Sequence, residues 1–122
     1  MADADLATRI DALAERARAD GEALEPPAQP PDEERAMEYL RNGVGPAVAV
    51  YLEARTGEWV RFDPERFERL ERAMNTWLEC YAACYGVDLD AEFTLRTAAE
   101  ALTDTNDIGD VARVLTKVPE PD

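Results

Sequence analysis

The chain has 122 residues, 46% of them hydrophobic, with a formal net charge of −14 and no histidine. This length fits one domain, and an excess of 27 acidic over 13 basic residues argues against direct binding to nucleic-acid phosphates. The longest apolar runs (47–52 and 80–85) fall far short of the roughly 20 residues that cross a bilayer, and the N-terminus lacks a signal pattern, so we expect a cytoplasmic protein without a membrane partner.

The first segment, residues 5–20, has the spacing of an amphipathic helix, with Leu6, Ile10 and Leu13 on its apolar side. Gly21 is expected to end this helix, and four prolines within residues 25–31 indicate an extended linker. The predicted organisation is an N-terminal helical arm (1–21), a Pro-rich linker (22–31), a helical domain (32–118) and a disordered tail (119–122). Because its apolar stripe is thin, the arm either docks loosely or folds against a partner.

The next segment, residues 32–42, is expected to form a short helix that ends in a turn at residues 43–46. Residues 46–56 fit two structures. As a helix they begin at Pro46 and end at Gly57, whereas as a strand they would pair with Trp59–Phe62 in a β-hairpin. The helix is preferred, and the hairpin stays open as the alternative.

The longest helix is predicted from Asp63 to Gly86. Asp63 can cap its first turn, Pro64 fits the first helical position, and Gly86 can adopt the left-handed conformation that ends a helix. Its apolar positions follow a heptad spacing and are Phe67, Leu70, Met74, Trp77, Tyr81 and Cys84. This seam fits an intramolecular core, with a dimer or partner interface as the other interpretation.

The C-terminal part is expected to contain a helix over residues 88–102, a polar turn over 103–107 and a final helix that begins at Ile108 and stops before Pro119. Asn106 or Asp107 is the expected cap of that last helix. The predicted fold is therefore all-α, a small helical bundle around one long central helix. The alternative is an α+β fold with one β-hairpin near residues 47–62.

The charge pattern resembles the composition of proteins from extreme halophiles, especially haloarchaea. Acidic residues are scattered along the whole chain, and Lys117 is the single lysine among the 13 basic residues. At about 1 M salt the Debye length is only about 3 Å, so long-range steering is largely lost. The resemblance then implies that the charge maintains hydration and solubility rather than attracting a basic partner.

The sequence offers little catalytic or metal-binding chemistry. The absence of histidine removes the Ser/His and Cys/His constellations, so we expect no enzyme and no cofactor. Cys80 and Cys84 lie one helical turn apart, but a zinc site needs about four ligands. Two chains could share four thiolates, and otherwise the two cysteines are small apolar core residues.

The best candidate contact surface is the segment around Trp59, which stands between Arg55 and Arg61, a composition common in binding hot spots. The apolar face of the predicted arm, with Leu6, Ile10 and Leu13, is a second candidate. We therefore predict a non-enzymatic interaction or regulatory module that binds another protein or a second copy of itself. The alternative function is a small-molecule or metal-binding protein that uses Cys80 and Cys84, in one chain or across a dimer.

Overall fold

The computed structural model describes residues 2–56 and 64–119. These residues form helices and contain no strand, which confirms the predicted all-α fold. The elements are, in chain order, α1 (Ala2–Ala23), α2 (Glu33–Tyr39), the π-helical turn η1 (Leu40–Val44), α3 (Gly45–Thr56), α4 (Pro64–Ala83), α5 (Leu95–Thr105) and α6 (Ile108–Thr116). Since Gly45–Thr56 is helical, the hairpin alternative is wrong for that half; its second half, 59–62, lies outside the described residues.

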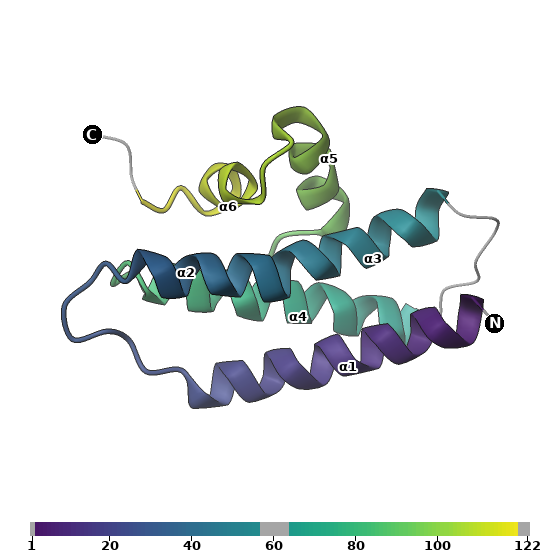
Figure 1. The fold of residues 1–122 in the computed structure, drawn as a ribbon, viewed down its shortest axis with the longest axis horizontal. Coiled ribbons are helices and arrows are strands. Elements are labelled where there is room, and N and C mark those ends of the chain that lie inside the picture. Colours follow the sequence, from purple (N-terminus) through teal and green to yellow (C-terminus); the bar gives the residue numbers. More distant parts are fainter. Residues whose placement is uncertain (1, 57–63, 120–122) are drawn as a thin grey trace.

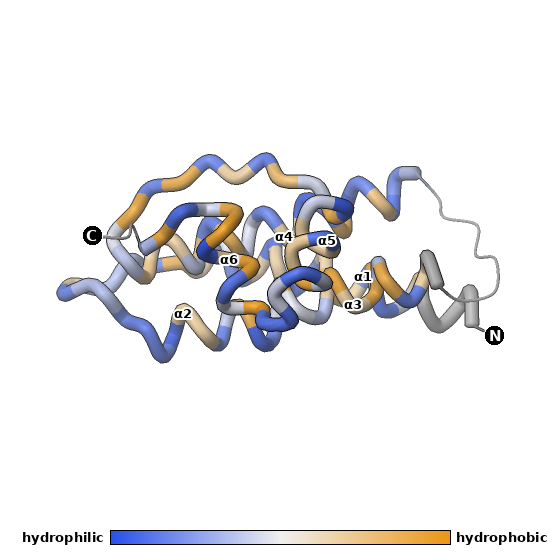
Figure 2. The backbone as a smooth tube through the Cα atoms, turned by 90° about the horizontal axis from the view of Figure 1, so that it is seen from above, coloured by the Kyte–Doolittle hydropathy of each residue, from blue (hydrophilic) through white to orange (hydrophobic). Residues whose placement is uncertain are grey.

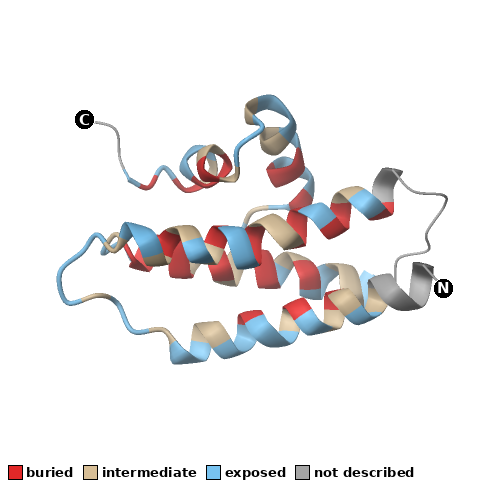
Figure 3. Cartoon of the chain, viewed as in Figure 1, coloured by how far each residue is buried: buried red, intermediate tan, exposed pale blue. Residues whose placement is uncertain are grey.

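The long helix α4 lies at the centre of the bundle, as the sequence predicts. α1 runs beside it in the same direction, α2 and α3 run back along it, and α5 and α6 cover the side away from α1 (Figure 1). Most of its heptad seam is buried within the single chain, at 2% exposure or less for Leu70, Met74, Trp77, Tyr81 and Cys84. The buried faces of the helices point toward one another (Figure 3), so the seam belongs to the intramolecular core.

The end of α4 has the predicted glycine stop. Gly86 adopts a left-handed conformation with φ +77°. Its N–H donates to the carbonyl of Ala83 at 2.9 Å, and the N–H of Val87 donates to the carbonyl of Ala82 at 3.0 Å. This pair of bonds is the Schellman arrangement, which satisfies the last free carbonyls of a helix.

The N-terminal helix does not end at Gly21 but continues to Ala23. A Cβ at Gly21 would lie 2.9 Å from Cγ2 of Thr76, so this glycine serves close approach of α1 to α4 rather than termination. Two bonds from Arg9 to Glu53, at 2.9 and 2.6 Å, join α1 to α3, and the Arg9 guanidinium lowers the pKa of Glu53. α1 is thus docked along its length, and the predicted domain boundary at residues 22–31 stays a prediction.

The predicted turn at residues 43–46 is wrong, because α2 continues through η1 into α3. Pro46 has no N–H and its ring would clash with the carbonyl four residues earlier in a regular helix. A wider turn absorbs this defect, and the N–H of Gly45 donates instead to the carbonyl of Leu40, five residues back. Gly43 lies in this turn against Trp77, and a Cβ there would come within 2.4 Å of the indole ring.

We expect Gly43→Ala to lower the free energy of unfolding by about 1–3 kcal/mol, the usual cost of overpacking a filled core. The measurement is urea denaturation in multi-molar KCl. A double-mutant cycle with Trp77→Phe provides the control, because the smaller ring leaves room for the methyl group. An equal cost of Gly43→Ala in both backgrounds would contradict a clash with the indole.

The segment between α4 and α5 is extended, so the helix predicted from residue 88 is wrong until Thr94. Its residues alternate between apolar and polar, which Figure 2 shows along the tube that leads from α4 to α5. Ala91 and Leu95 are buried, Leu89 and Phe93 are half-buried, and the residues between them are exposed. This alternation with period two is the signal of an extended segment with one buried side.

A polar stripe on α4 holds the extended segment in register. Three stripe residues one turn apart, Glu71, Asn75 and Glu79, bond to the backbone of every second residue of the segment. Glu79 accepts from the N–H of Ala91 at 3.0 Å, and Glu71 accepts from the N–H of Leu95 at 2.9 Å. Asn75 accepts from the N–H of Phe93 and donates to its carbonyl, both at 2.9 Å. The side chains of the helix thereby replace a neighbouring strand.

We expect Asn75→Ala to lower the free energy of unfolding by about 1–3 kcal/mol, because it leaves the backbone donor and acceptor of Phe93 without partners. Amide hydrogen exchange at Phe93 should become faster, while the exchange of amides in α1 stays unchanged. Asn42→Ala is the matched control, since Asn42 is exposed on η1. Unaltered protection of the Phe93 amide would show that the stripe does not hold the segment.

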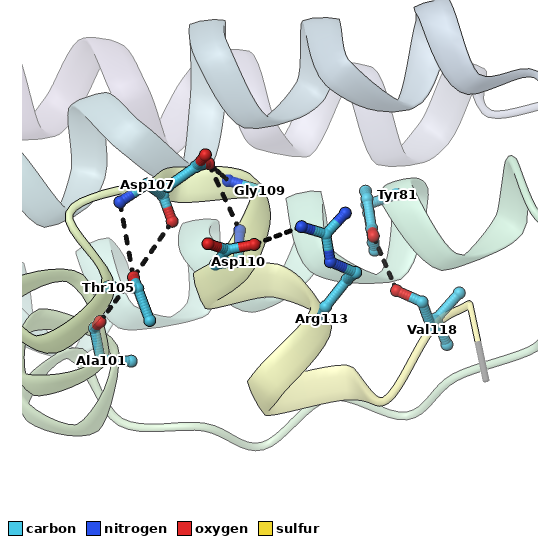
Figure 4. Close-up of polar contacts among 8 residues, drawn as sticks. All are labelled: Tyr81, Ala101, Thr105, Asp107, Gly109, Asp110, Arg113 and Val118. Carbon is cyan, nitrogen blue, oxygen red and sulfur yellow. Dashed lines mark hydrogen bonds and ion pairs between the residues drawn. The ribbon is translucent and has the colours of Figure 1, made fainter. Parts of the chain in front are cut away.

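Figure 4 shows the cap that begins α6 and the buried hydroxyl that holds the segment after it. Asp107 caps α6, one of the two predicted caps, by accepting from the N–H groups of Gly109 at 2.7 Å and Asp110 at 3.4 Å. The other candidate, Asn106, instead ends α5 in a left-handed conformation. Past α6, the hydroxyl of Tyr81 donates to the carbonyl of Val118 at 2.7 Å, which joins the C-terminal segment to α4.

Candidate functional site

The predicted contact residues fall in different parts of the structure. Ile10 and Leu13 are 1% and 7% exposed and form part of the core that α1 shares with α4. A partner can reach them only if α1 leaves α4. The side chains of Leu6 and Arg55 are outside the described part, as are Trp59 and Arg61 altogether. Of the two predicted surfaces, the arm face is therefore occupied within the chain, and the segment around Trp59 stays a prediction.

Cys80 of α4 and Cys84, which directly follows that helix, lie in the core at 1% and 0% exposure. Burial raises the pKa of Cys80 to about 12 and also raises the pKa of Cys84. A thiol acts as a metal ligand or nucleophile only after it loses its proton. The described residues contain no group of three or more His, Cys, Asp or Glu side chains placed to hold a metal ion. A second chain could reach these thiols only through an unpacked core.

A groove of about 630 Å³ lies between α3 and α5. We name it the α3–α5 groove, and its lining residues are Tyr51, Leu52, Arg96, Ala99, Glu100, Thr103 and Asp104. Tyr51 and Ala99 are buried at 6% and 5% exposure, and Leu52 is half-buried. Arg96 and Glu100 form an ion pair at 3.5 Å on the exposed face of α5. The groove thus joins an apolar floor to a charged rim.

Two of the residues that line the groove, Tyr51 and Thr103, are positioned by contacts that the sequence does not predict. The ring of Tyr51 packs on Phe67 of α4 with centroids 5.6 Å apart and planes at 51°, which fixes the base of α3. The Thr103 hydroxyl donates to the carbonyl of Ala99 at 3.0 Å and so remains turned toward α5 itself. The spacing of Arg96 and Glu100 indicates an exposed helix face. Which residues of α3 lie opposite that face follows only from the packing.

One helix of the groove, α3, leads in the sequence toward the segment around Trp59. Leu52 lines the groove, and Arg55 follows three residues later in the same helix, close to where the described part of α3 stops at Thr56. An apolar floor with charged residues at its edge is the usual arrangement of a protein contact surface. Chemically the groove can take an apolar side chain on its floor and form ion pairs at its rim.

Comparisons with known proteins place the chain in one family. No curated protein and no solved structure matches it. Among the described residues, no helix is both long and apolar enough to cross a membrane. One family profile matches residues 4–120, nearly the whole chain, so the chain belongs to the family described as Domain of unknown function (DUF8055).

Proposed function

We propose that this chain is a non-enzymatic protein–protein interaction module of a halophilic cytoplasm. Its contact surface comprises the α3–α5 groove, together with the segment from Arg55 to Arg61 that follows Leu52 of the groove in the sequence. The observation that supports this proposal most strongly is the groove itself, which has an apolar floor and a charged rim. In the sequence, the helix that carries Leu52 of the groove leads into a segment in which Trp59 stands between two Arg. Trp and Arg are the residue types that most often dominate binding energy at protein interfaces.

The partner is another protein, with self-association as the competing outcome of the test. A second copy would bring a net charge of −14 to a molecule that already carries the same net charge. Buried apolar contact and short-range ion pairs at the rim must therefore supply the affinity. In molar salt the charge repulsion between the two molecules is screened beyond about 3 Å, and the groove can then bind an apolar side chain.

We expect Thr103→Trp to abolish partner binding, because the indole would fill the groove from its exposed α5 side. Ala49→Trp is the matched control: it adds the same ring to an exposed position of α3 that does not line the groove. The tagged variants are compared in multi-molar KCl by partner co-purification from the source cells and by light scattering for absolute mass.

The outcomes of this comparison are distinct. Loss of a specific partner with Thr103→Trp, but not with Ala49→Trp, supports the proposal. Loss of the partner with Trp59→Ala supports it too: if Trp59 is a hot spot, this variant should weaken the binding free energy by at least about 2 kcal/mol. Conversion of a dimer to a monomer by Thr103→Trp would assign the groove to self-association. Equal retention of the partner by Thr103→Trp and Ala49→Trp would refute the groove as the contact surface.

The halophilic part of the proposal has its own test. We expect the helical circular dichroism signal at pH 7 to be lost in dilute buffer and kept in multi-molar KCl. The reason is that the repulsion between like charges extends over about 30 Å at 0.01 M salt but only over about 3 Å at 1 M. If repulsion is the cause, acidifying the dilute sample toward the pI of about 4.3 should restore part of the signal. Full stability in dilute buffer at pH 7 would rule out this use of the charge.

A further inference from the structure

A second groove, of about 210 Å³, lies between α1 and α4 and gathers arginines in a strongly acidic chain. Three of the side chains that line it are Arg18, Arg69 and Arg72, and the single carboxylate among its lining residues is Glu15. Ala17 and Ala73 form the floor at 1% and 3% exposure. Their small side chains leave this space between the longer arginine side chains. We call this hollow the arginine groove.

The arginines of the groove come from both helices. Arg69 and Arg72 lie three residues apart on α4, and Thr76 follows one turn later, so all three lie along one side of that helix. Arg18 approaches from α1. A ligand in the groove would therefore meet donors from two directions, which a single helix surface cannot offer.

Protein carboxylates satisfy only part of these donors. Arg18 binds Glu15 and Glu22, and Arg69 binds Asp11 at 3.0 Å through one of its terminal nitrogens. Within residues 2–56 and 64–119, neither the Arg72 guanidinium nor the Thr76 hydroxyl makes a hydrogen bond or ion pair. Each guanidinium has five N–H groups in a planar fork, so several donors remain for a ligand.

We propose that the arginine groove binds a small phosphoryl group, either free phosphate or the terminal phosphate of a small metabolite. Guanidinium groups match phosphate with two parallel N–H···O bonds to two separate oxygens, whereas a chloride ion offers a single acceptor atom. The volume suits a phosphoryl group and excludes a folded partner. Contact bonds of this kind also persist in concentrated salt, where the repulsion of an anion by the rest of this acidic chain is screened beyond about 3 Å.

The competing explanation is that the arginines only form ion pairs within the protein: Arg69 joins α4 to Asp11 of α1, and Arg18 pairs with Glu15 and Glu22 of its own helix. Arg72 separates the two explanations, because it has no partner in the described part of the chain and its loss breaks no ion pair there. Arg72→Gln should therefore leave the thermal stability unchanged while it removes a phosphate donor. Arg41→Gln is the matched control, since Arg41 is likewise exposed without a described partner but lies on η1, outside the groove.

The experiment follows the arginine Nε–Hε cross-peaks of the full chain by NMR in 2 M KCl at pH 7.5. Potassium phosphate and glycerol 3-phosphate are titrated separately at constant ionic strength. We expect saturable shifts at Arg69 and Arg72, and an apparent dissociation constant about tenfold higher in Arg72→Gln, the loss of one charged hydrogen bond. Arg41→Gln should bind as the parent does.

The two titrations distinguish the sources of the phosphoryl group. Saturation by both compounds supports a groove that is open to the terminal phosphate of a metabolite, whereas saturation by inorganic phosphate alone supports free phosphate as the ligand. The proposal is overturned if the shifts do not saturate, if Arg41 shifts as much as Arg72, or if Arg72→Gln and Arg41→Gln bind phosphate equally well. None of these outcomes depends on the α3–α5 groove.

Discussion

The Trp77 indole is the contact on which the arrangement of α1, η1 and α4 depends. Its ring lies against Gly43, its N–H donates to Asp20 at 2.8 Å, and the guanidinium of Arg16 lies 5.9 Å from the ring centroid. A buried indole needs a partner for its N–H, and α1 supplies it. The thin apolar stripe of α1 is therefore sufficient to dock this helix, because a specific polar contact and a cation–π contact add to it.

The helix α4 also organises the C-terminal half of the chain, through a second side that is polar. One side of α4 is the apolar seam, and another carries the stripe of Glu71, Asn75 and Glu79 that binds residues 91–95. Four residues of helix rise about 6 Å, and two residues of extended chain span about 6.6 Å. The two repeats match closely over this distance, so each turn of the helix meets one inward-facing peptide group. α5 then starts at Leu95 with Thr94 as its cap, at the point where the segment reaches the last contact with the stripe, the bond from Leu95 to Glu71.

The two grooves lie between different pairs of helices. α5, with the α3–α5 groove, is on the side away from α1, whereas the arginine groove lies along the joint of α1 and α4 (Figure 1). Their chemistry differs in the same way: one has an apolar floor and a mixed rim, and the other has mainly guanidinium donors. A protein contact on one groove and a phosphoryl group on the other would therefore not compete for space.

The sequence by itself indicated the all-α class and the long central helix with its apolar seam and Gly86 stop, and it narrowed the cap of the last helix to Asn106 or Asp107, because these depend on local periodicity and backbone preference. Only the tertiary structure decided the roles of Gly21 and Gly43, which serve close helix contacts rather than turns. It also decided that 88–94 is extended: the alternation in that segment was visible, but its partner, the polar stripe, is distant in sequence. Both grooves arise where residues from separate helices meet. Local pattern carries no information about such pairs, so their residues could not be assigned to a site from the sequence.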